Sequence, residues 1–288
     1  MSGNTKERGG FHVFAAILGD EHRRGRKLVR EADLRFRSKT AWGGDLVEKY
    51  QVDVQGLLRT IAEGSVVGKL LLGEINKLSR ELRIIPAAFR GFEETRARPV
   101  SPEKAVVVGS SPAYCAANVC SGGGTDVVIL FEPSTWNGPA TVANLDPFGD
   151  ETPADVLFHE MMHAYRFMLG IGTTETMAKS FHFLEEFYAI LLANIYRSET
   201  GRTVGLRADH SLPRHRLSEM PGDGIYTGAV YARNAAMYYT EYKYEIDRLC
   251  AEPRMDTVCR PLGAATYPQQ VWNPIRSRTM RASMYSTP

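Results

Sequence analysis

The residues best suited to chemistry lie in the segment VLFHEMMHAYRFMLG, residues 156–170. His159, Glu160 and His163 form the pattern HExxH in this segment. Two histidines four residues apart on a helix share one face, so both imidazoles can bind a single metal ion. Glu160 is turned by about 100° around the helix axis from His159. Its carboxylate is therefore expected beside a water on the metal rather than on the metal itself.

Zinc is the ion that this pattern predicts. Zinc lowers the pKa of a bound water to about 7, which makes the water a nucleophile at neutral pH. A glutamate beside that water can take its proton and pass it to a leaving amine. The segment thus predicts a hydrolase that holds one Zn²⁺ per chain through His159 and His163 and uses Glu160 as general base and then acid. The alternative is a structural histidine pair with a glutamate on the surface.

A catalytic zinc ion usually has three protein ligands and a water, so a third ligand is needed. The residue six positions after His163 is Leu169, which excludes the arrangement HExxHxxGxxH. Another arrangement takes a glutamate from a later helix, and the apolar segment 180–199 carries Glu185 and Glu186 near its beginning. A buried carboxylate is costly unless it is paired or metal-bound.

Glu186 is the predicted ligand, because it continues a stripe of small and apolar residues at helical spacing, Ala189, Ile190 and Ala193. Glu185 is the alternate ligand, and both carboxylates could instead lie exposed at the helix start. His182 is a weaker candidate for a ligand.

A zinc peptidase also needs a polar group that stabilises the oxyanion. His210 is the predicted residue, with Arg207, Tyr226 and Tyr231 as competitors. Each of these side chains could equally be structural. Asn194 lies two turns beyond Glu186 and is expected either to form a hydrogen bond that supports a ligand or to cap a break in the backbone.

These side chains must be positioned by a helix that begins after Thr152 and ends near Gly170 or Gly172. Thr152 is a suitable N-cap and Pro153 a suitable first residue. Ahead of it, DVVILFEP at 126–133 reads as a buried strand. This strand is expected either at the sheet edge, where a peptide could dock, or in the centre. Further strands are predicted at 83–90 and 104–108, and two helices within 53–83 that break at Gly64 and Ser65.

The composition is that of a globular protein of 288 residues, with 43% hydrophobic and 24% charged residues. No apolar run is long enough for a membrane span. The net charge of +2 gives no signal for nucleic-acid binding. We expect a basic segment or linker at 1–50 without a cleavable signal peptide, a catalytic domain at 51–265 and an irregular tail at 266–288.

Four cysteines fall into two close pairs, Cys115 with Cys120 and Cys250 with Cys259. Local pairing would give two disulfides, and four unpaired thiols are the alternative. An oxidising destination would favour the disulfides.

HEMMHAYRF at 159–167, followed by EEFYAILLANIYRSETGRTVGLRADH at 185–210, resembles the zincins that use a glutamate ligand, or gluzincins. Within these, the chain is similar to the NleD-like bacterial effector metallopeptidases and to metallopeptidase domains of type VI secretion spike proteins. The resemblance covers roughly residues 55–212. It implies an α+β zincin-like fold, in which a small mixed sheet packs on the HExxH helix and a helical lower part supplies Glu186.

The same resemblance implies a toxin-like peptidase that a specialised secretion system delivers into the periplasm or cytosol of a target cell. Its expected partners are a protein or peptide substrate, a secretion-carrier protein and a cognate immunity protein. Two alternatives remain open from the sequence. One is a zinc hydrolase that cuts cell-wall peptides, and the other is a non-catalytic binding protein stabilised by zinc.

Overall fold

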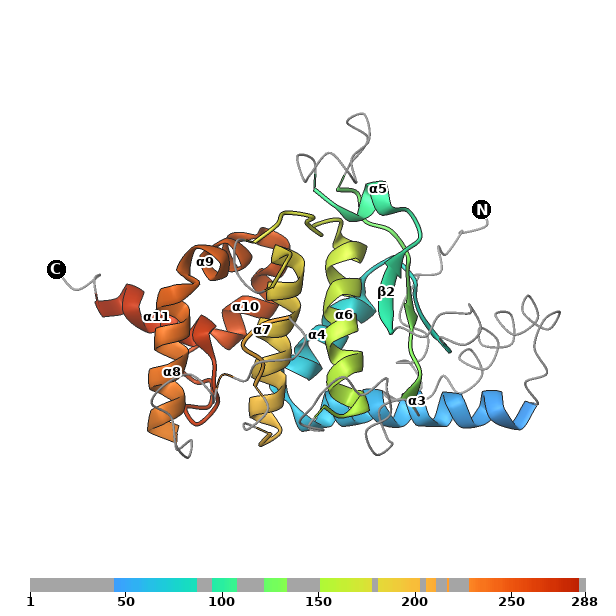
Figure 1. The fold of residues 1–288 in the computed structure, drawn as a ribbon, viewed down its shortest axis with the longest axis horizontal. Helices are drawn as coiled ribbons and strands as arrows, with labels where there is room; N and C mark the ends of the chain where they lie inside the picture. The colour runs from blue at the N-terminus through green and yellow to red at the C-terminus, as the bar shows by residue number, and fades with distance from the viewer. Residues whose placement is uncertain are drawn as a thin grey trace, which may run out of the picture.

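The computed structural model describes residues 44–86, 95–107, 122–133, 151–177, 181–202, 206–210, 217 and 228–284. Most of the basic segment 1–50, together with Cys115, Cys120 and Tyr226, lies outside these residues. The described part is a mixed α+β structure with many helices and one small sheet (Figure 1). The coarse fold class predicted from the sequence is therefore confirmed.

The sheet has three strands in the order β1-β3-β2. β1 (Leu82–Ile85) runs parallel to β3 (Val127–Leu130), and β2 (Arg96–Pro99) runs antiparallel to it. β3 is thus the central strand of the described sheet, which is the second of the two alternatives left open by the sequence. Val127 and Ile129 are fully buried, as expected for an apolar strand with neighbours on both sides.

The structure differs from the sequence prediction at the other strands. Residues 104–107 of the segment 104–108, expected as a strand, begin in the short helix α5 (Pro102–Ala105), and among these described residues Val106 forms a single bridge, to Gly172. Its helix starts at a serine followed by proline, which favours a helical turn over a strand. β2 was not predicted, because RARP has no apolar alternation.

Two helices precede the sheet, as predicted. α3 spans Gly44–Gly64 and α4 spans Val66–Lys77. Ser65 separates them, since its extended backbone ends one helix and its hydroxyl caps the next by accepting a hydrogen bond from the N–H of Gly68. α3 begins at Gly44, so its first residues lie within the predicted basic segment 1–50. Tyr50, the last residue of that segment, is buried.

α6 (Pro153–Leu169) is the helix that carries HEMMH. Thr152 and Asp155 form a reciprocal capping box at its start, and Gly170 ends it in the left-handed conformation. The helix lies between the sheet and α7 (Leu184–Glu199) (Figure 1). Because neighbours cover it on several sides, nearly all of its residues are buried. This explains why its sequence is apolar around most of its circumference.

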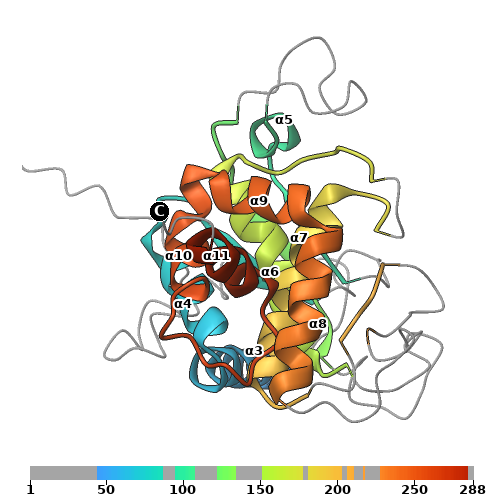
Figure 2. The same ribbon diagram turned by 90° about the vertical axis from the view of Figure 1, so that its left-hand side faces the viewer.

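The C-terminal part forms α8 (Gly228–Glu241), α9 (Lys243–Ala251), the short 3-10 helix η5 (Pro253–Met255), α10 (Asp256–Leu262) and α11 (Pro274–Met284). These helices cluster on the side of α7 away from α6 (Figures 1 and 2). The prediction of an irregular tail at 266–288 is therefore wrong for residues 274–284, which form α11. Trp272 and Ile275 are almost fully buried, and Pro274 begins α11, a position that proline favours.

The end of α6 is tightly packed against the glycine-rich segment 122–124. Gly170 has a φ of 71°, and a β carbon there would lie 2.3 Å from the carbonyl oxygen of Gly122. A side chain at this position would be strained by its backbone and would also force the two segments apart. In contrast, a β carbon at Gly73 in α4 would meet nothing within 4 Å.

We expect Gly170→Ala to lower the free energy of unfolding by about 2–4 kcal/mol, from backbone strain and overpacking together. Gly73→Ala is the matched control and should raise it by about 0.5–1 kcal/mol, because alanine favours an open helical position. Urea denaturation of both variants measures the difference. A Gly170→Ala protein as stable as wild type would contradict the packing described for this helix end.

Candidate metal centre

The HExxH histidines of α6 meet the first turn of α7. The Nε2 atoms of His159 and His163 are 3.1 Å apart, and each lies 3.3 Å from Oε2 of Glu186. His159 and His163 are almost completely buried. The structure therefore brings together the two histidines and the glutamate that were predicted as metal ligands.

These three residues fit a zinc ion. Two atoms bound to one tetrahedral zinc at 2.0–2.1 Å are about 3.3–3.4 Å apart, which is close to the separations found here. Oε2 of Glu186 is buried, and it has no hydrogen-bond partner among the described residues. A buried carboxylate oxygen without a donor is costly. A cation between this oxygen and the two imidazoles would satisfy it.

His210 joins this group from a different segment. Its Nε2 atom lies 3.3 Å from the same Oε2 atom of Glu186. His159, Glu186 and His210 each offer a ligand atom within 4.8 Å of the others, and this group could hold a metal ion. The rings of His159 and His210 stack with centroids 6.3 Å apart. His210, predicted as an oxyanion-stabilising residue, thus lies at the distance of a ligand.

Glu160 faces the sheet beside the two histidines. Its Oε2 atom accepts a hydrogen bond of 2.6 Å from the backbone N–H of Ala97 on β2. This bond fixes the orientation of the carboxylate on the edge strand of the described sheet. Glu160, the predicted general base, is therefore oriented by a backbone N–H group. The sequence contained no signal that Ala97 would provide this group.

Glu185 does not belong to the cluster. Its carboxylate accepts hydrogen bonds from Nε of Arg166 at 2.8 Å and from the N–H of Thr173 at 3.0 Å. Oε1 of Glu185 is also 3.7 Å from Nδ1 of His163. Glu185 therefore contacts the ring nitrogen of His163 that does not face Glu186. A carboxylate often holds a metal-binding histidine through its second nitrogen in this way.

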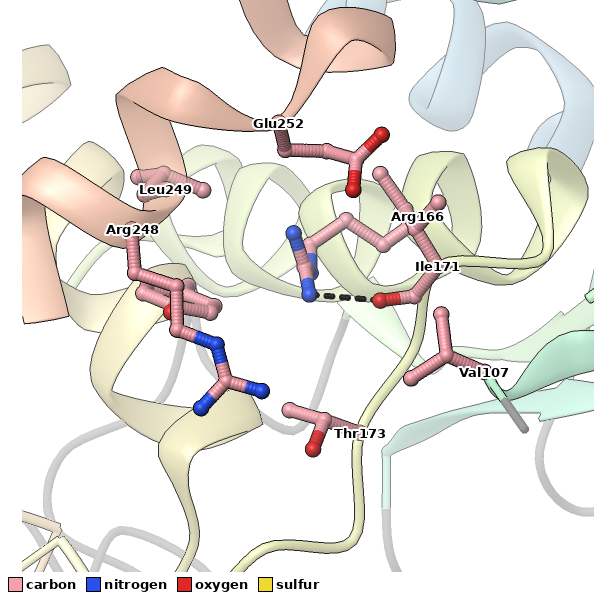
Figure 3. Close-up of a pocket in the computed structure, with 8 residues that line it drawn as sticks. Val107, Arg166, Ile171, Thr173, Arg248, Leu249 and Glu252 are labelled. Atoms are coloured by element: carbon pink, nitrogen blue, oxygen red, sulfur yellow. Dashed lines mark hydrogen bonds between the residues drawn. The ribbon is translucent and has the colours of Figure 1, made fainter. Parts of the chain in front are cut away.

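Arg166 is a residue of the site that sequence reasoning missed. It lies three residues after His163 on α6 and also donates to the carbonyl oxygen of Ile171 (Figure 3). On its far side is a small cavity, lined in part by Arg248 and Glu252 (Figure 3). The signal that could have revealed Arg166 is a charged residue within a helix that is otherwise buried and apolar.

Burial and neighbouring charges shift the pKa values in this cluster. Burial lowers the pKa of His159 to about 4 and raises the pKa of Glu160 to about 7. At His163, burial opposes the charge, but the carboxylates of Glu186 and Glu185 hold the pKa well above its ordinary value.

The carboxylates respond in the opposite direction. Burial works against their charge, yet His163 and His159 hold the pKa of Glu186 well below its ordinary value. Arg166 and His163 likewise lower the pKa of Glu185. An ionised Glu186 next to a neutral His159 favours binding of a cation, whereas His163 must release its proton before it can bind one.

The remaining predicted residues lie around this centre. The ring of His182 is 6.1 Å from that of His210, centroid to centroid, and its backbone has a φ of 61°. Arg207 forms an ion pair of 3.5 Å with Glu151. Tyr231 is buried on α8. Asn194 makes two hydrogen bonds of 2.8 Å with the backbone of Arg207, and its support of a metal ligand stays a prediction.

Cys250 on α9 and Cys259 on α10 are free thiols in the structure. The two side chains are in contact, and this contact with Cys259 lowers the pKa of Cys250. The predicted local pair is therefore adjacent but not bonded, which agrees with the alternative of unpaired cysteines.

No helix among the described residues has the length and apolar character that crossing a membrane requires. No protein-family model, curated protein or solved structure matches this chain. The resemblance to the glutamate-ligand zincins therefore stays a prediction, and the geometry around Glu186 is the main basis for assigning a function.

Proposed function

We propose that this protein is a zinc-dependent metallopeptidase with a zincin-like fold. The observation that carries the proposal is the buried Oε2 atom of Glu186, which lies 3.3 Å from Nε2 of both HExxH histidines. His159, His163 and Glu186 would hold the ion. When bound, zinc lowers the pKa of a water to about 7 and polarises the carbonyl group of the substrate.

The chain's own residues would carry the proton and the charge. Glu160 would accept a proton on its carboxylate and deliver it to the amine of the leaving group. The hydrogen bond from Ala97 orients that carboxylate. His210 or Arg207 would donate a hydrogen bond to the oxyanion as it forms. Glu185 and Arg166 would hold the ring of His163 in place.

The biological role that we propose follows from the resemblance. The protein would be a bacterial effector, delivered by a secretion system and paired with an immunity protein if it acts on rival bacteria. Its substrate would be a protein or peptide, and a peptide of the cell wall is the alternative with the same chemistry.

A structural zinc site is the second candidate function. It is favoured by the position of His210, because a structural zinc ion usually has four protein ligands. In that case the protein would be a binding module stabilised by zinc. Glu160 would then have no chemical role, and its replacement would leave function unchanged.

The proposed function is tested by removing and restoring the metal. We expect the purified protein to contain close to one zinc per chain and to cleave a mixture of denatured proteins and synthetic peptides. Dialysis against a chelator should abolish cleavage, and stoichiometric zinc should restore it. Elemental analysis and mass spectrometry of the products give both readouts. A protein that binds no zinc, even when zinc is added, would overturn the proposal.

A further inference from the structure

His210 is placed next to Glu186 by contacts that leave little freedom to the chain before it. Asn194 is fully buried, and its side-chain amide binds both the N–H and the carbonyl oxygen of Arg207. Leu206 and Asp209 are also buried. The backbone that leads to His210, three residues after Arg207, is therefore held by buried contacts.

The distance from His210 to Glu186 is that of two ligands on one ion. Its Nε2 atom is 3.3 Å from Oε2 of Glu186, the same separation that His159 and His163 show. An oxyanion-stabilising residue must instead leave room for the substrate oxygen between itself and the metal. His210 lies instead at ligand distance from Glu186, and with His159 and Glu186 it forms a group that could hold a metal ion.

His210 is also the member of the group that can leave most easily. Its side chain is 38% exposed, whereas those of His159 and His163 are 11% and 8% exposed. The two buried histidines and Glu186 are held on helices, while His210 lies outside any helix. A ligand that moves away would therefore be this one.

We propose that His210 is a fourth protein ligand of the zinc ion and closes the site when no substrate is bound. This inference rests on the proposed zinc site and adds its regulation. Four protein ligands leave a tetrahedral ion without an open position. When a substrate or another ligand enters, the imidazole of His210 would move aside, and with a proton taken up from solvent on Nε2 it would donate a hydrogen bond to the oxyanion.

X-ray absorption at the zinc edge tests the inference, because it counts imidazole ligands without relying on activity. We expect three imidazoles in the wild-type protein with zinc bound and two in His210→Ala. Competition with a chelator should show that His210→Ala binds zinc at least about tenfold more weakly than wild type. Losing a residue that only hydrogen-bonds to a metal ligand already weakens binding by about this factor. Addition of acetohydroxamate, a strong zinc ligand, should reduce the wild-type count from three to two.

The matched control is His182→Ala, which removes an exposed imidazole close to His210. Its imidazole count and zinc affinity should equal those of wild type. Two imidazoles in the wild-type protein would overturn the fourth-ligand inference and leave the proposed peptidase intact. Absence of zinc from the wild-type protein would instead overturn the proposed function itself. The wild-type count decides the matter even if His210→Ala does not fold.

Discussion

Replacing Glu160 by glutamine is expected to lower peptide hydrolysis by about 10²- to 10⁴-fold, the range that a positioned acid or base contributes. The amide cannot accept a proton from water, so the step that makes the nucleophile loses its base. Glutamine is nearly the same size and can still accept the hydrogen bond from Ala97, so the fold should be kept. Initial rates on the cleaved peptide, measured with zinc content, give the comparison.

Zinc content separates this effect from loss of the site. Glu160→Gln should retain close to one zinc per chain, because Glu160 is not among the proposed ligands. Glu63→Gln on α3 is the control, since this exposed glutamate lies outside the proposed machinery. Unchanged hydrolysis in Glu160→Gln would remove Glu160 from the mechanism. The structural zinc site would be favoured by a different result. In that case the wild-type protein binds zinc but hydrolyses no peptide, and Glu160→Gln behaves in the same way.

The second large effect is expected from Glu186→Gln, compared with the same change at its neighbour. Loss of the Glu186 carboxylate should weaken zinc binding by at least about 100-fold. This is the largest loss of affinity expected for a residue that only hydrogen-bonds to a ligand, and a ligand itself should contribute more. Zinc should then no longer raise the unfolding temperature, because a ligand stabilises only the state that it binds. Elemental analysis and thermal unfolding with and without zinc measure both results.

Glu185→Gln should behave differently, although it changes the adjacent carboxylate. Zinc should remain bound, because Glu185 is not a proposed ligand: it binds Arg166 and Thr173 and touches the cluster only at Nδ1 of His163, 3.7 Å away. The free energy of unfolding should fall by about 3–5 kcal/mol, since Arg166 is left as a buried charge without its carboxylate. If Glu185→Gln loses zinc and Glu186→Gln keeps it, the two carboxylates have been assigned the wrong way round.

The local features of the site could be predicted from the sequence because they depend on neighbours within a few residues. Thr152 and Pro153 begin α6, and Gly170 ends it, through capping contacts with the helix itself. His159 and His163 share a face because of helical spacing alone. The break at Ser65 is likewise local. These elements needed no information about the rest of the fold.

Which carboxylate reaches the histidines was decided by the packing of α7 against α6. Glu185 and Glu186 are turned by about 100° from each other around one helix, so a stripe of small residues favours one without excluding the other. The orientation of α7 directs Glu186 to the two Nε2 atoms and Glu185 to Arg166. Because this orientation depends on contacts across the whole helix pair, the sequence left the choice open.

The sequence by itself determined the HExxH helix, its two ends and the residue types that can bind zinc. The tertiary structure alone decided that β3 is central, that β2 supplies the N–H for Glu160, and that His210 lies 3.3 Å from Glu186. It also decided that residues 274–284 form a helix packed on α8 rather than an irregular tail. These features join segments far apart in the chain, and side-chain packing and buried hydrogen bonds select among arrangements that local propensity treats alike.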